Sequence, residues 1–292
     1  MGPFEYLESQ TTQEALSLLS KYGNKAKVLA GGTDLVPLLK EKTIKPEYVI
    51  SLGRIAGLDY IRFDGEKGLR IGALTTIRSI EQSSQLPPKY GLICQAASQT
   101  ASMAVRNVAT VGGNLCNASP SADIATALLT LSATTKLVSP AGERMVALED
   151  FFVGPGATVL KTDELLVEVQ IPSPPAHTAG VYIKYTTRGG EELALVGVAA
   201  LLTLSAGDGI CTDAKVALGA VAPTPIRARR TEGVLKGKKI DSGLIEKAAQ
   251  TASDESSPID DSRGSAEYKR ELVKVIARNA IMQAAELAKS AI

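Results

Sequence analysis

Hydrophobic positions in the first part of the chain follow helix-like and strand-like spacings in turn. Ala15, Leu16 and Leu19 recur at the spacing of one helix face, whereas the short apolar runs that follow are typical of buried strands. Thr11 or Thr12 can cap the first helix, and Pro37 is tolerated in the first turn of the second. The pattern predicts, in order, a helix at 13–20, a strand at 27–30, a helix at 35–40 and a strand at 48–50. We therefore expect a small α/β unit over residues 1–56.

The next part of the chain mixes both kinds of pattern, which predicts an α+β unit over residues 57–175. Ser119 and Pro120 resemble the start of a helix, with Asp123 in its first turn. Residues 172–176 are rich in proline and read as a linker. The predicted elements are strands at 69–75 and 165–171, a hairpin from 136–138 and 144–148, and helices at 91–102 and 124–131.

The last part, residues 176–292, begins with strand-like runs and ends with helical ones. Glycine-rich turns at 189–190 and 207–209 separate the strand-like runs. The runs lie at 181–187, 193–205 and 214–221, and the helical sequence lies at 245–252 and 265–291. We expect a C-terminal domain with a three-stranded antiparallel sheet and a helical bundle, in a chain of α+β class.

Two glycine pairs stand out against this background: Gly31-Gly32 and Gly112-Gly113. Each is predicted to follow a short apolar strand and to run into a helix. Glycine adopts backbone angles that other residues avoid and has no side chain, so consecutive glycines can turn their N–H groups toward a phosphate. Because the pairs belong to different units, a ligand that both contact would lie in the crevice between those units.

Composition narrows the function classes. The formal net charge is +1, which gives no basic surface for nucleic acid, and the longest apolar run, 193–204, is too short to span a membrane. The N-terminus lacks a signal-peptide pattern, so we expect a cytoplasmic protein. Three scattered cysteines and one histidine argue against a disulfide framework, an iron–sulfur or metal site in this chain, and a histidine-based nucleophile. No catalytic side chain is assigned, and a bound cofactor is expected to supply the chemistry.

The motifs resemble those of one known family. Ala30-Gly31-Gly32-Thr33-Asp34-Leu35 with Pro37, and Thr110-Val111-Gly112-Gly113-Asn114 with Ser119-Pro120 and Asp123, are similar to the paired FAD motifs of the medium subunits of molybdenum hydroxylases, of the bacterial xanthine dehydrogenase and aerobic carbon monoxide dehydrogenase type. The segments 163–166, 171–172, 182–185, 195–199 and 264–270 resemble further parts of that family, in the same order along the chain.

The resemblance implies a two-part FAD-binding fold, a small N-terminal α/β unit and an α+β middle unit, followed by the C-terminal domain. It implies that Asp123 bonds the cofactor, that the backbone near Leu166 approaches the flavin, and that Tyr182 and Lys184 lie near the isoalloxazine. The implied cofactor-binding residues are Leu29, Ala30, Gly31, Gly32, Thr33, Asp34, Leu35, Val36, Thr110, Val111, Gly112, Gly113, Asn114, Asp123, Leu166, Tyr182 and Lys184. The glycine motifs contain no histidine that could attach the flavin, so noncovalent FAD is expected.

The resemblance also implies partners. A small subunit with [2Fe-2S] clusters would deliver electrons to FAD, which would pass them to NAD, a quinone or another acceptor, while a large subunit would hold the molybdenum cofactor. The expected assembly is a heterotrimer or its dimer. Two other readings of the residues stay open: a stand-alone FAD-dependent oxidoreductase, and a nonenzymatic nucleotide-binding or assembly protein.

Overall fold

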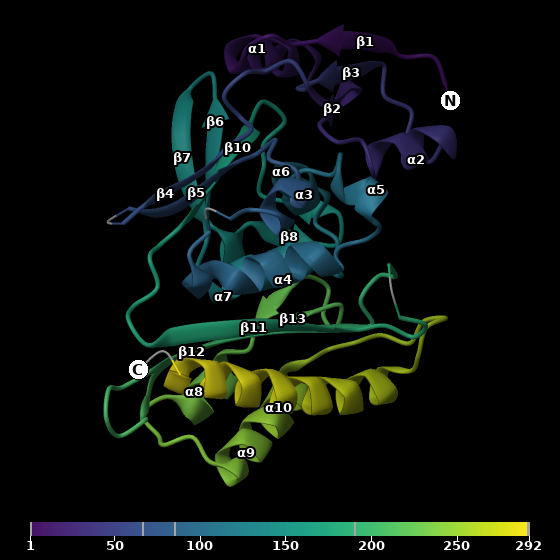
Figure 1. Cartoon of the computed structure of the whole chain (residues 1–292). Helices are drawn as coiled ribbons and strands as arrows, with labels where there is room; N and C mark the ends of the chain where they lie inside the picture. The colour runs from purple at the N-terminus through teal and green to yellow at the C-terminus, as the bar shows by residue number, and fades with distance from the viewer. Residues whose placement is uncertain (1, 66, 85, 190, 291–292) are drawn as a thin grey trace.

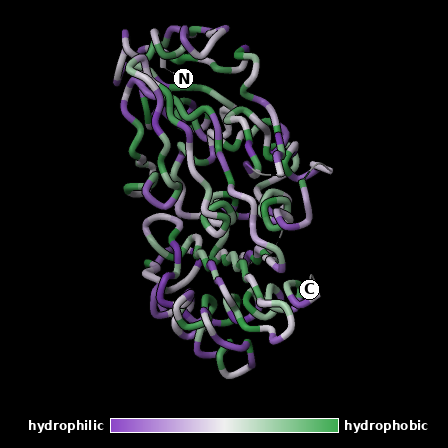
Figure 2. The backbone as a smooth tube through the Cα atoms, turned by 90° about the vertical axis from the view of Figure 1, so that its left-hand side faces the viewer, coloured by the Kyte–Doolittle hydropathy of each residue, from purple (hydrophilic) through white to green (hydrophobic). Residues whose placement is uncertain are grey.

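Three units follow one another from the N-terminus to the C-terminus, and the two ends of the chain lie at opposite ends of the molecule (Figures 1 and 2). The structure is a computed structural model that describes residues 2–65, 67–84, 86–189 and 191–290. Three clusters of buried hydrophobic side chains centre on the three units, and two of them extend into a neighbouring unit. The α+β class and the two-part arrangement before a C-terminal domain are confirmed. The limits at 56 and 175 stay a prediction.

The N-terminal unit is a three-stranded parallel sheet with order β1-β3-β2 and two helices. Thr11 caps the first helix by accepting a bond from the Glu14 N–H, and Ala15 and Leu19 of that helix are buried. The first strand is absent from the predicted pattern because three of its four residues are exposed. The elements are β1 (Glu5–Glu8), α1 (Thr12–Tyr22), η1 (Gly23–Lys25), β2 (Ala26–Leu29), α2 (Leu35–Lys40) and β3 (Tyr48–Ser51).

The middle unit packs helices against one face of a five-stranded antiparallel sheet with order β4-β5-β10-β6-β7. The strands are β4 (Ile61–Asp64), β5 (Gly68–Gly72), β6 (Thr134–Ser139), β7 (Gly142–Ala147) and β10 (Leu165–Ile171), with a small pair formed by β8 (Phe152–Gly154) and β9 (Ala157–Thr158). The helices are α3 (Ile77–Glu81), η2 (Pro88–Tyr90), α4 (Gly91–Gln99), α5 (Met103–Arg106), α6 (Val111–Asn117), α7 (Asp123–Thr130) and η3 (Leu148–Asp150).

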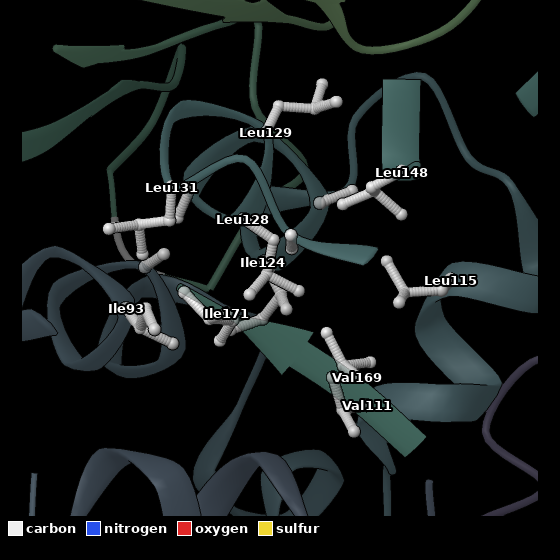
Figure 3. Close-up of a cluster of buried hydrophobic side chains, with 14 of the residues drawn as sticks. Ile93, Val111, Leu115, Ile124, Leu128, Leu129, Leu131, Leu148, Val169 and Ile171 are labelled. Carbon is white, nitrogen blue, oxygen red and sulfur yellow. The ribbon is translucent and has the colours of Figure 1, made fainter. Parts of the chain in front are cut away.

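Helix α7 lies at the centre of the middle unit. All eight of its residues are buried, and Ile124 and Leu128 point into the same apolar cluster as Val169 and Ile171 of β10 (Figure 3). The helix also packs against β12 and β13 of the next unit. A helix that is buried on every side connects two cores, so α7 fixes the C-terminal unit against the middle one.

The C-terminal unit is an antiparallel sheet between two helical layers. Helices α4 and α7 cover one face, and α10 covers the other (Figure 1). The three predicted strands are present with limits shifted by one to three residues, and the sheet gains a two-residue fourth strand, β14, which lies beyond the predicted three. The elements are β11 (Thr178–Tyr185), β12 (Val196–Leu204), β13 (Cys211–Gly219), β14 (Ile226–Arg227), α8 (Arg229–Leu235), α9 (Ser242–Glu255) and α10 (Ala266–Ser290). Over the part of the chain that the structure describes, no helix has the length and apolar content to cross a membrane.

Helix limits differ from the predicted ones by up to three residues, and two of the differences lie in the middle unit. The helix expected at 91–102 ends at Gln99, because Ala101 adopts a φ of 43° and reverses the chain before α5. The helix start expected at Ser119 and Pro120 also differs: α7 begins at Asp123, and Ala122 occupies its cap position without a side-chain bond.

Candidate functional site

The first glycine pair lies directly after β2 and leads into α2. Gly32 has a φ of 74°, a conformation that favours glycine. Among the described residues, the backbone N–H groups of Gly31, Gly32, Thr33 and Asp34 donate to no protein acceptor. Consecutive free N–H groups in such a turn form an anion-binding surface. This part of the motif therefore has the donors that a phosphate requires.

The second glycine pair is built differently. The predicted strand before it is wrong, since Thr110 makes only an isolated bridge to Thr76, and both glycines lie in the first turn of α6. The Gly112 N–H donates to the Ala73 carbonyl over 2.9 Å, and the Gly113 N–H donates to the Thr110 hydroxyl over 3.1 Å. The protein itself uses these donors. A Cβ at Gly112 would lie 2.8 Å from the Ala73 carbonyl oxygen, so packing requires this glycine.

The structure brings the two glycine motifs together. A Cβ at Gly31 would lie 2.0 Å from the carbonyl oxygen of Val108, just before the second motif. A Cβ at Gly113 would face the Ala30 methyl at 3.9 Å. The absence of a side chain at Gly31 thus lets backbone from the N-terminal unit approach backbone from the middle unit, and the two motifs lie side by side.

Asn114 adds a buried side-chain oxygen, Oδ1, that lacks a hydrogen-bond donor within the described part of the chain. A buried acceptor without a donor is costly. A ligand with hydroxyl or N–H groups would supply that donor, while the free N–H groups at 31–34 would receive its phosphates. This combination fits a dinucleotide such as FAD, which carries a diphosphate beside hydroxyl groups.

Asp123, Tyr182 and Lys184 form a second cluster, where α7 meets β11. The Tyr182 hydroxyl donates to Asp123 Oδ1 over 2.5 Å, and Lys184 Nζ lies 3.0 Å from Asp123 Oδ2. Lys184 Nζ also donates to the Gln99 carbonyl over 2.7 Å. The Lys184 and Asp123 side chains are only 3% and 6% exposed. Because β-strand side chains alternate, Tyr182 and Lys184 share the sheet face that packs on the middle unit.

Burial dominates the electrostatics of this cluster. Desolvation raises the pKa of the Asp123 carboxyl, although the Lys184 ammonium and the Tyr182 hydroxyl oppose that change. Desolvation and the Asp123 charge raise the pKa of Tyr182 well above its ordinary range, so its hydroxyl remains a donor. The cluster is an internally satisfied ion pair rather than a free acid or base.

Two glutamines that the sequence analysis missed complete the junction. The Tyr182 N–H donates to Gln95 Oε1 over 2.9 Å, and Gln99 Nε2 donates to the Tyr182 carbonyl over 3.4 Å. Both glutamines come from α4, four residues apart and hence on one helix face. Strand β11 is an edge strand, and these amides occupy the backbone groups that its edge leaves free. Their i, i+4 spacing in the sequence indicates that the two glutamines share one helix face, but it does not indicate that β11 packs against that face.

The remaining predicted residues have mixed positions. Leu29 ends β2, and Leu35 and Val36 begin α2, close to the first glycine pair. Val111 and Leu166 instead have their side chains in the middle core, Leu166 beside a bulge in β10. The structure therefore brings residues 29–36 and 110–114 together, and gathers Asp123, Tyr182 and Lys184 at a separate junction.

Comparison with family models identifies the two parts of the chain. Residues 2–174 match the FAD binding domain in molybdopterin dehydrogenase, and residues 181–284 match the CO dehydrogenase flavoprotein C-terminal domain. The chain is thus a flavoprotein of the molybdenum-dependent dehydrogenases. It belongs to the family of their FAD-binding medium subunits, which are parts of oxidoreductases.

Individual relatives agree with this assignment over nearly the whole length. The chain is 35% identical over 282 residues to the glyceraldehyde dehydrogenase medium chain of Sulfolobus acidocaldarius, covering 97% of this chain and 98% of that one. It is 34% identical over 289 residues to the carbon monoxide dehydrogenase medium chain of Afipia carboxidovorans, covering 99% of each. A crystal structure of a Cu,Mo-CO dehydrogenase matches with a TM-score of 0.93 at 33% identity, covering 98% of both chains.

The buried ion pair yields a quantitative expectation. Asp123→Asn leaves the Lys184 ammonium buried beside a neutral amide, and we expect the free energy of unfolding to fall by about 3–5 kcal/mol. Adding Lys184→Met to Asp123→Asn removes the unpaired charge. The double variant should therefore lose less free energy of unfolding than the sum of the losses in the two single variants. Urea unfolding of the four proteins measures the coupling, and strictly additive effects would contradict an energetically coupled pair.

Proposed function

We propose that this chain holds FAD noncovalently between its two glycine motifs and transfers electrons as the flavin subunit of a molybdenum-containing dehydrogenase. The observation that carries the proposal is the row of N–H groups at residues 31–34, opposite α6, which find no acceptor among the residues that the structure describes. The buried unpaired oxygen of Asn114 supports the same site.

Each part of the site has a proposed role. The N–H groups of Gly31 to Asp34 bind the diphosphate, with Leu29, Ala30, Leu35 and Val36 forming the turn around them. Residues 110–114 form the opposite wall, where Thr110 orders the first turn of α6 and Asn114 accepts a hydrogen bond from the cofactor. FAD can accept electrons singly and release them in pairs, chemistry that belongs to the cofactor.

We further propose that Asp123, Tyr182 and Lys184 act on the flavin electrostatically and that the backbone near Leu166 approaches it. Lys184 has a buried ammonium, and in a region of low polarity one charge acts over several ångströms. It would favour the reduced, anionic flavin. Because both oxygens of Asp123 already have protein donors, the cluster holds its protons in place and offers no free general base.

The partners are inferred from the relatives. The curated relatives are named as medium chains and FAD-binding subunits of dehydrogenases, names that imply further chains. We propose a large subunit with the molybdenum cofactor and a small subunit with [2Fe-2S] clusters, assembled as a heterotrimer or its dimer in the cytoplasm. Electrons would leave through NAD, a quinone or another acceptor.

The two alternative functions have less support. A stand-alone oxidoreductase needs its own acid or base at the substrate, and the buried Asp123 cluster is internally bonded. A nonenzymatic assembly protein is at odds with membership in a family of dehydrogenase subunits.

Noncovalent FAD gives the first functional test. The purified chain should be yellow, and acid precipitation should release all of the flavin into the supernatant as FAD, because no histidine lies in the glycine motifs. Chromatography of the supernatant identifies the flavin. Colour that stays in the pellet, or FMN in the supernatant, would refute this assignment.

The close packing around the second glycine motif gives a second test. Gly113→Val places its Cβ 2.9 Å from the Thr110 hydroxyl that caps α6 and its methyl groups toward Ala30, and we expect FAD retention to be lost. Gly154→Val is the matched control, because a Cβ there has no neighbour within 4 Å. Flavin content per folded chain, with the thermal unfolding midpoint of each apo-protein, separates loss of the site from loss of the fold. Full FAD occupancy in Gly113→Val would show that the pair is structural only.

The charge of Lys184 gives a third test. Lys184→Met removes the ammonium, so the midpoint potential of bound flavin should fall. Lys215→Met is the control, since Lys215 bonds Ser132, which lies beyond the opposite end of α7 from Asp123. Spectroelectrochemical titration measures both. An unchanged potential in Lys184→Met with FAD still bound would exclude Lys184 from the flavin site.

A further inference from the structure

We propose that Arg106 is a positioning residue for the proposed FAD site, acting through the backbone turn at residues 100–102. The inference rests on the proposed function. Arg106 would not touch the cofactor itself, but it would hold the two glycine motifs and the Asp123–Tyr182–Lys184 cluster in their positions relative to one another.

Arg106 uses its guanidinium in two directions at once. Its Nε lies 2.9 Å and its Nη2 3.5 Å from the carboxylate oxygens of Glu81 on α3. Its Nη1 donates to the carbonyls of Thr100 and Ala101 over 3.1 Å and 2.7 Å. The two side chains are 12% and 17% exposed. A planar guanidinium can make such a fork, which an ammonium cannot reproduce.

Glu81 responds to this contact. Its desolvation would raise the pKa of the carboxyl, but the hydrogen bonds from Arg78 and Arg106 hold that pKa below its ordinary value. Glu81 is thus a charged anchor, and Arg106 transmits its position from α3 to the turn after α4.

The turn itself needs an external restraint. Ala101 has a φ of 43°, a conformation that costs energy in a residue with a Cβ. The carbonyls that Arg106 binds follow the last turn of α4, where carbonyl groups have no helical partner. Arg106 therefore satisfies two acceptors and stabilises the reversal between α4 and α5 with the same group.

Two contacts around the proposed FAD site depend on this reversal. On one side, the Gln99 carbonyl accepts the bond from Lys184 Nζ. On the other, α5 leads to Val108, whose carbonyl abuts Gly31, and then to the second glycine motif. A shift of the turn would therefore disturb both the bond between Lys184 and the Gln99 carbonyl and the contact between Val108 and Gly31.

Arg78 provides a matched comparison. It donates to the same Glu81 carboxylate over 2.9 Å, as Arg106 does, but no bond joins it to the turn at 100–102 within the described residues. Removal of Arg78 perturbs the anchor alone, whereas removal of Arg106 perturbs the anchor and the turn.

The test uses the full chain with Arg106→Gln, Arg106→Lys and Arg78→Gln. For each apo-protein we would measure the dissociation constant for FAD by flavin fluorescence, the visible circular dichroism of the bound flavin and the thermal unfolding midpoint. We expect Arg106→Gln to weaken FAD binding about tenfold or more and to change the dichroism of the flavin, because buried bonds to a charged group are lost. Arg106→Lys should recover only part of the affinity, and Arg78→Gln should stay within about twofold of the parent.

Affinity and dichroism equal to the parent in Arg106→Gln would overturn the proposal, as would an equal loss in Arg78→Gln. If Arg106→Gln does not fold, Arg106→Lys decides: parental affinity and dichroism in that variant would show that the fork has no positioning role. A parent chain that binds no FAD would refute the proposed function instead, independently of the variants.

Discussion

The close approach of two backbones at Gly31 and Val108 is the constraint on which the site depends. Any side chain at Gly31 would collide with the Val108 carbonyl, so the turn after β2 reaches the segment before the second motif only because this position has none. The approach places the free N–H groups of residues 31–34 opposite α6, and neither motif has the whole set of groups alone. Two segments that are distant in the sequence thereby lie together: one provides N–H donors, and the other faces them across a space suited to a diphosphate.

The C-terminal unit is attached by polar bonds as well as by apolar packing. Helix α7 supplies both, since its Ile124 and Leu128 lie in the middle core while Asp123 at its start binds Tyr182 and Lys184 of β11. A buried ion pair contributes little net stability compared with an apolar contact, but it is costly to break and it fixes one geometry. This geometry would suit a junction that has to keep a strand in register beside a cofactor.

The sequence predicted most of the fold and part of the site, for reasons that lie in particular residues. Strand β10 was predicted with its observed limits, because its apolar run is buried in the sheet centre. Strand β1 was missed because its pattern is mostly exposed, and the break after Gln99 was missed because Arg106 and Ala101 create it through tertiary bonds. Glycine pairs looked alike in sequence, yet one leaves its N–H groups free and the other bonds them to Ala73 and Thr110. Only the structure distinguishes these roles, because both depend on neighbours that are remote along the chain.

A crystal structure of the FAD-loaded chain would show whether the turn at residues 31–34 binds the diphosphate of FAD. We expect diphosphate oxygens within hydrogen-bond distance of the N–H groups of Gly31 to Asp34, with Asn114 Oδ1 bonded to a donor of the cofactor. A diphosphate bound elsewhere, with those N–H groups facing only water, would contradict this proposal.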